Sequence, residues 1–80
     1  MKYKVLEHPT RGIFVEYDDI DMKPRFKWSI TRDSHEVHAF YNEASIQREL
    51  SRWPDRIKSR TEVVEVDTSA KRPFRMRLSQ

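Results

Sequence analysis

The sequence predicts an α+β domain in which a small antiparallel sheet of about five strands carries one helix packed on one face. Three observations lead to this prediction. Segments of alternating polar and apolar residues recur along residues 2–41, as expected of half-buried strands. A helical period follows over residues 42–53, and the β-branched run Val63, Val64, Val66 predicts a returning strand. With 80 residues, the chain is expected to be a single domain, 1–80.

The first part of the chain predicts a β-hairpin. Residues 2–7 and 13–17 both alternate between polar and apolar side chains. The chain's one glycine, Gly12, stands in the turn between them, where a positive φ is expected. We therefore interpret Gly12 as a structural residue.

Residues 18–24 are expected to form an acidic loop that contains Asp18, Asp19 and Asp21. These carboxylates do not predict a metal site, because Lys23 stands where the loop of an EF-hand needs its glycine. His35 and His38 lie three apart, so in a strand they point to opposite faces and do not share a ligand. We expect no metal and no cofactor.

Residues 25–31 give the clearest strand pattern. Phe26, Trp28 and Ile30 share one face, and polar side chains occupy the other. Residues 35–41 follow after a short turn, so the sequence predicts that these two segments pair as a second hairpin.

The segment after the second hairpin predicts an amphipathic helix. Asn42 is a good N-cap, and Ile46, Leu50 and Trp53 recur at helical spacing, so they are expected to pack on the apolar face of residues 25–31. Pro54 interrupts the pattern. The position at which this helix ends decides whether Arg48, Arg52 and Arg56 form one stripe.

The positive charge is concentrated in the second part of the chain. Of the 16 lysine and arginine residues, 9 lie in residues 48–80, beside only 5 acidic residues, and seven of those 9 are arginines, which suit phosphate or carboxylate recognition. Residues 71–80 are expected to be a basic C-terminal strand or a mobile arm. The candidate binding residues for a nucleic acid or a protein partner are Arg48, Arg52, Arg56, Lys58, Arg60, Lys71, Arg72, Arg75 and Arg77.

This charge pattern favours a binding protein over an enzyme. RNA, bound mainly through its phosphates and with weak sequence specificity, is the preferred partner; DNA and an acidic protein surface stay open. The second hypothesis is a DNA-binding or transcription-modulating protein that acts on the RNA polymerase of a host. Tyr41, Trp53 and Phe74 are the aromatic residues near the cations, although Trp53 also continues the core stripe. A third hypothesis is a metal-independent ribonuclease that uses Glu36 and His38 as base and acid, with Lys27 or an arginine on the phosphate.

The composition limits the chemistry and the cellular compartment that we expect for this protein. The chain contains no cysteine, which excludes disulfides and thiolate chemistry, and it has no apolar run of the ~20 residues that a membrane span needs. We therefore expect a cytoplasmic protein without a membrane partner. A domain this small has a limited core, so self-association as a homodimer is also expected.

One resemblance adds to these expectations. Residues 28–30, residues 38–44 (HAFYNEA) and residues 63–66 follow the order strand, strand ending in an aromatic residue, capped helix, strand. This order resembles small phage-encoded α+β proteins that take over the host or neutralise its defences, including inhibitors of bacterial RNA polymerase and of the ToxN endoribonuclease. The resemblance covers roughly residues 25–67. It implies a non-enzymatic inhibitor of a host or defence enzyme, and it transfers no individual functional residue.

Overall fold

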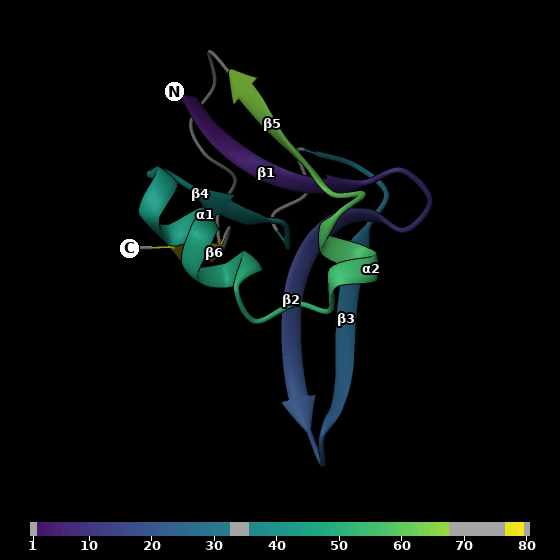
Figure 1. Cartoon of the computed structure of the whole chain (residues 1–80). Coiled ribbons are helices and arrows are strands. Elements are labelled where there is room, and N and C mark those ends of the chain that lie inside the picture. Colours follow the sequence, from purple (N-terminus) through teal and green to yellow (C-terminus); the bar gives the residue numbers. More distant parts are fainter. Residues whose placement is uncertain (1, 33–35, 68–76, 80) are drawn as a thin grey trace.

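The computed structural model describes residues 2–32, 36–67 and 77–79. Its elements, shown in Figure 1, are β1 (Lys2–His8), β2 (Gly12–Ile20), β3 (Lys23–Ser29), β4 (His38–Phe40), α1 (Glu43–Leu50), α2 (Asp55–Lys58), β5 (Glu62–Asp67) and β6 (Arg77–Ser79). Five antiparallel strands and one main helix confirm the predicted α+β class. Neither helix is long and apolar enough to cross a membrane among the residues described.

Strand β1 is the centre of the sheet. Along one edge it pairs with β5 over its length, from Lys2 opposite Asp67 to Glu7 opposite Glu62. Its other edge is shared, because β4 pairs at Lys4 and β2 pairs at Glu7 and His8. The short strand β6 then pairs in parallel with β4. Residues 77–79 of the predicted C-terminal segment are therefore a strand, and residues 71–76 lie outside the described part.

The predicted first hairpin is confirmed. His8 pairs with Gly12 across the turn that joins β1 to β2. Gly12 has a φ of 111°, which side chains rarely tolerate. A Cβ atom at this position would also lie 2.5 Å from the carbonyl oxygen of Ser29. Gly12 is needed both for the turn and for the close approach of β3.

The predicted acidic loop and second hairpin are wrong. Residues 18–20 belong to β2, only Asp21 and Met22 form the turn, and β3 begins at Lys23. Strand β3 pairs with β2 instead of β4, because Tyr17 and Phe14 of β2 lie opposite Phe26 and Trp28. A cross-strand aromatic match outweighs the sequence proximity of the next segment.

A β-bulge explains why three consecutive residues of β2 are buried. Phe14 pairs with Trp28 and Glu16 pairs with Lys27, so Val15 is the extra residue. The bulge changes the phase of the strand and places Phe14 and Tyr17 on the same face. The simple alternation predicted for residues 13–17 does not hold.

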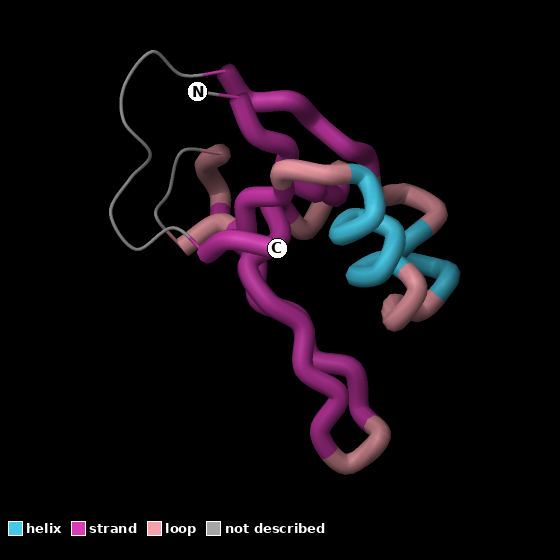
Figure 2. Tube along the Cα trace, turned by 90° about the vertical axis from the view of Figure 1, so that its left-hand side faces the viewer, coloured by secondary structure: helices cyan, strands magenta, loops and turns pink. Residues whose placement is uncertain are grey.

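The core has two parts, one on each face of the sheet. The helix side contains Leu6, Phe14, Tyr17, Phe40, Ile46, Trp53 and Ile57, with Phe26, Trp28 and Leu50 packed against them. The other side contains Tyr3, Val5, Ile13, Val37 and Ala39, with Val64 and Val66. Both helices lie on one side of the sheet, as Figure 2 shows.

The helix prediction is confirmed at its start and shortened at its end. The Asn42 side chain accepts a hydrogen bond of 2.8 Å from the backbone N–H of Ser45, which caps α1. The helix ends at Leu50, four residues before Pro54. Trp53 nevertheless enters the core, where its ring lies 5.0 Å from Phe26 and 4.8 Å from Phe14. The predicted partner Ile30 lies beyond β3 and is 97% exposed.

Replacing Gly12 with alanine is expected to lower the free energy of unfolding by about 2 kcal/mol or more, because φ and the contact with Ser29 both oppose a side chain. Urea unfolding followed by circular dichroism measures this. Thr31→Ala, at an exposed position, is the control and is expected to change stability by less than about 0.5 kcal/mol. Equal stability of both variants would contradict the assigned turn.

In the turn between β2 and β3, the introduction of a glycine is expected to stabilise the fold. Asp21 and Met22 have φ values of 54° and 60°, the geometry of a type I′ turn, which favours glycine in the second place. Met22→Gly is therefore expected to raise the free energy of unfolding by about 1 kcal/mol. Lys23→Gly, in the adjoining strand, is expected to lower it by about 0.5–1 kcal/mol. The same urea titrations compare the two variants.

Candidate nucleic-acid interface

The predicted binding residues separate into three groups. Five lie in the segment of α1 and α2: Arg48, Arg52, Arg56, Lys58 and Arg60. Lys71, Arg72 and Arg75 lie outside the described residues. Arg77 begins β6, of which the backbone pairing is described.

Arg48, Arg52 and Arg56 do not form the stripe that a continuous helix would have given them. The chain leaves the helix after Leu50, and Pro54 has an extended backbone (φ −60°, ψ 140°) before α2 begins. Arg56 therefore starts a new axis and is not one turn beyond Arg52. Proline lacks a backbone N–H and its ring clashes with the preceding turn, so the helix does not continue through Pro54.

Arg52 connects the end of α1 to the sheet. Its guanidinium lies 5.1 Å from the centre of the Tyr17 ring, and Nη2 donates a hydrogen bond of 3.4 Å to the Tyr17 carbonyl oxygen. Nη1 forms an ion pair of 3.3 Å with Glu49, whose carboxylate also accepts a hydrogen bond from the indole of Trp53. Arg52 is thus largely a structural residue. Its contacts lie within the fold, so it does not belong to the candidate interface.

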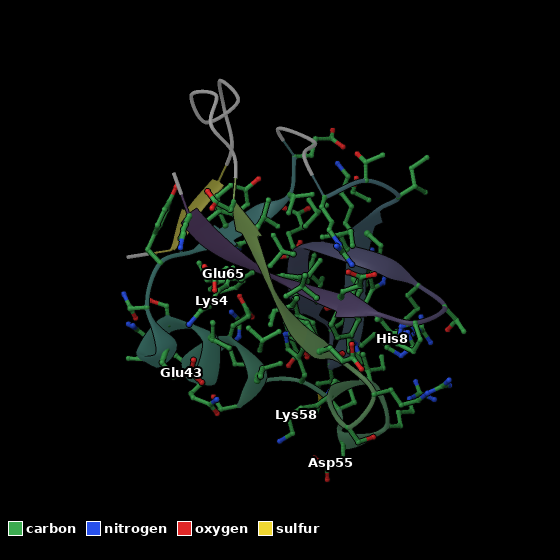
Figure 3. The ribbon with its side chains drawn as sticks, turned by 90° about the horizontal axis from the view of Figure 1, so that it is seen from above. Lys4, His8, Glu43, Asp55, Lys58 and Glu65 are labelled. Atoms are coloured by element: carbon green, nitrogen blue, oxygen red, sulfur yellow. The ribbon has the colours of Figure 1, made fainter. Side chains whose placement is uncertain are left out.

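Arg56 and Arg60 lie in the short α2 segment. The turn continues beyond Lys58 through backbone bonds from Arg60 to Ile57 and from Thr61 to Lys58. These bonds join residues three apart, so the segment ends in a 3₁₀ turn that carries Arg60 beyond the helix that holds Arg56. Lys58 forms an ion pair of 3.5 Å with Asp55, and both project from α2 in Figure 3. Arg56 is exposed and forms no ion pair within the described residues.

His8 lies where the first turn meets the end of α2. Its ring is buried, and Nδ1 accepts hydrogen bonds of 3.3 Å from the backbone N–H groups of Thr10 and Arg11. Burial lowers the pKa of His8 below its usual 6.5, and the charges of Arg11 and Arg60 lower it further. A neutral His8 therefore lies close to two arginines from distant parts of the chain.

Arg11 and Arg60 both act on the charge of His8, and Arg56 and Lys58 precede Arg60 in the same short segment; we call these four cations the basic cluster. The sequence analysis missed Arg11, because nothing in the local pattern connects the first turn to α2. Nearby, Arg32 binds Glu7 through Nε at 2.9 Å and Nη2 at 2.8 Å, so this glutamate is already engaged by another cation. The cluster retains exposed guanidinium groups at Arg11, Arg56 and Arg60.

The aromatic residues do not surround the cluster. Trp53 is buried, which confirms its interpretation as a packing residue. Tyr41 is 43% exposed, but its ring lies 6.4 Å from Tyr3 near the N-terminal part of β1. Phe74 lies outside the described residues. The basic cluster is therefore better suited to contacts with phosphates than to stacking with bases.

The proposed acid–base pair has a different geometry from the one expected. Strand β4 begins at His38, so Glu36 lies in the preceding turn. The His38 ring is stacked on Phe40 at 4.3 Å and 4°, within the aromatic core. Glu36 forms an ion pair of 3.8 Å with Lys27. His35 lies outside the described residues, among which no group of three or more acidic or histidine side chains could hold a metal ion.

A shallow cavity of about 260 Å³ lies at the other end of β1. Its lining residues are Lys2, Tyr3, Lys4, Phe40, Tyr41 and Glu65. Lys4 and Glu65 are paired positions on β1 and β5, and Figure 3 shows them side by side. The sequence analysis did not predict this cavity, since its wall joins three separate segments.

His8 makes stability depend on pH. Its pKa is lower in the folded chain than in the unfolded chain, so the unfolded state binds more protons as the pH falls below about 7.5. The stability that neutral His8 contributes is present above pH 6.5 and is lost as the pH falls through 6.5 toward the lower folded pKa. His8→Asn keeps an acceptor for Thr10 and Arg11 but does not titrate. Between about pH 7.5 and 5, the free energy of unfolding measured in urea should fall more steeply for the original chain than for His8→Asn. The slopes should differ by at most about 1.4 kcal/mol per pH unit. Parallel curves would contradict this assignment.

Comparison with known proteins finds no matching family model, no matching curated protein and no matching solved structure. The resemblance to phage-encoded inhibitors therefore depends on the order of strands and helix alone.

Proposed function

We propose that this protein is a non-enzymatic RNA-binding protein that contacts phosphates through the basic cluster. The observation that carries the proposal is that the exposed Arg11 and Arg60, from distant parts of the chain, both act on His8, which burial keeps neutral, while the exposed Arg56 lies in the adjoining helix α2. Like charges in proximity oppose folding, so a surface that gathers them is well suited to an anionic partner. Arginine is also the side chain best shaped for phosphate oxygens.

The surroundings of the cluster favour phosphate contacts over base reading. Helix α2 has 4 residues and α1 has 8, and α1 buries Ile46 in the core. Neither offers a long exposed helix of the kind that reads a major groove. Binding with little sequence preference and strong salt dependence follows from phosphate contacts alone. RNA is the partner to test first, with duplex DNA and an acidic protein as comparisons.

The positions of the histidines favour a binding role over catalysis. Nδ1 of His8 is occupied by the first turn, and the ring of His38 is packed between aromatic residues. A general acid or base must reach its substrate. Inhibition of a host or defence enzyme is the consequence that the resemblance suggests, and we propose it as the role that RNA binding serves.

The test compares two double variants that remove the same charge. Arg56→Ala with Arg60→Ala is expected to weaken binding to a single-stranded RNA about tenfold or more at 0.1 M salt, and to reduce the slope of log affinity against log salt by about 1–2. Lys23→Ala with Arg25→Ala removes two exposed cations from the β2–β3 hairpin and serves as the control. Fluorescence anisotropy at several salt concentrations measures both.

Three results separate the alternatives. A loss of RNA affinity confined to the double variant Arg56→Ala with Arg60→Ala supports binding through the basic cluster. Equal losses in both variants would mean that net charge, not this surface, controls binding. Absence of RNA binding by the original chain at low salt would overturn the proposal, and cleavage of the RNA by a clean preparation would replace it with the ribonuclease hypothesis.

A further inference from the structure

The β2–β3 hairpin projects from the body of the molecule. Figure 2 shows its outer part extending away from the helices and the other strands, and the chain measures 39 × 24 × 20 Å. Every residue from 18 to 25 is exposed. On one face of this part, Asp18 lies opposite Arg25 and Ile20 lies opposite Lys23. The body of the protein does not need this extension for its core.

The tip of the hairpin presents apolar side chains to solvent. Met22 is 93% exposed and Ile20 is 49% exposed. Met22 also occupies a turn position with a φ of 60°, where glycine would relieve the backbone. A large apolar side chain at such a position contributes nothing to the core and is free to contact another molecule.

The cavity at the N-terminal part of β1 has matching properties. Tyr3 and Phe40 are buried and form an aromatic floor, with the Tyr41 ring beside them. Lys2 and Lys4 supply positive charge on the rim, and Glu65 supplies one negative charge. Its volume of about 260 Å³ is large enough for a methionine side chain and part of a neighbouring residue. Thioether groups pack favourably against aromatic rings.

We propose that the hairpin tip of one copy docks into this cavity of a second copy. Met22 would contact the aromatic floor, Asp21 would face the lysines of the rim, and Lys23 would face Glu65. The turn between β2 and β3 and the N-terminal part of β1, which lines the cavity, lie at opposite ends of the molecule in Figure 1, so a chain cannot fill its own cavity. Residues 18–25 carry three carboxylates against the two cations Lys23 and Arg25, and this net negative charge disfavours a nucleic acid as the partner of the tip.

This contact joins different surfaces of the two copies, so it is head-to-tail and not symmetric. A single hairpin tip buries a small area, and we expect a dissociation constant of about 0.1–1 mM that rises with salt. The association is separate from RNA binding, because it uses neither α2 nor the first turn. Each property can therefore be lost without the other.

The first experiment measures self-association of the full chain by sedimentation equilibrium up to about 1 mM. Met22→Gly is expected to weaken association at least tenfold although it stabilises the fold, so misfolding cannot explain the loss. Met22→Leu keeps an apolar side chain at the tip and is expected to stay within threefold of the original. Lys4→Glu, and separately Tyr41→Ala, alter the cavity and are expected to weaken association by a similar factor.

Mixing two impaired variants tests the direction of the contact. Met22→Gly leaves an intact cavity, and Lys4→Glu leaves an intact tip, so an equimolar mixture should form 1:1 dimers and nothing larger. A tip-to-tip contact would not be restored by this mixture and would overturn the proposal. So would a chain that stays monomeric up to about 1 mM, or tip variants that associate as well as the original.

Discussion

Strand β1 carries the constraint on which the other elements depend, because both its faces and both its edges are used. Tyr3 and Val5 pack on one side of the sheet, and Leu6 packs on the other. Strand β5 follows one edge, while β2 and β4 divide the second edge between them. A strand that is satisfied in all four directions leaves little freedom to its neighbours, so a chain of 80 residues reaches a defined core.

The aromatic cluster on the helix side connects this sheet to the candidate interface. Trp53 inserts beside Phe14 and Phe26, between the end of α1 and the extended backbone at Pro54. Arg52 then fastens the turn to Tyr17. The same packing that stabilises the fold therefore positions α2, and with it the cations next to the first turn.

The two proposed surfaces have different physical characters. The basic cluster is polar and held against the body of the protein, whereas the hairpin tip is apolar, acidic and extended away from it. Long-range charge attraction suits the first surface to a flexible polyanion. Shape and side-chain contact suit the second surface to a defined cavity. The two proposed interactions use separate surfaces, so neither would compete with the other.

The sequence by itself determined the α+β class, the first hairpin with its glycine, the cap at Asn42, the burial of Trp53 and the concentration of arginines after residue 47. These features depend on neighbours in the chain, which local patterns report. Only the tertiary structure decided that β3 pairs with β2, that the arginine stripe breaks, that Arg11 joins Arg60, and that a cavity faces away from the hairpin tip. Each of these features depends on contacts between segments that are distant in the chain. The packing and strand register that stabilise such contacts produce no periodic pattern in the sequence.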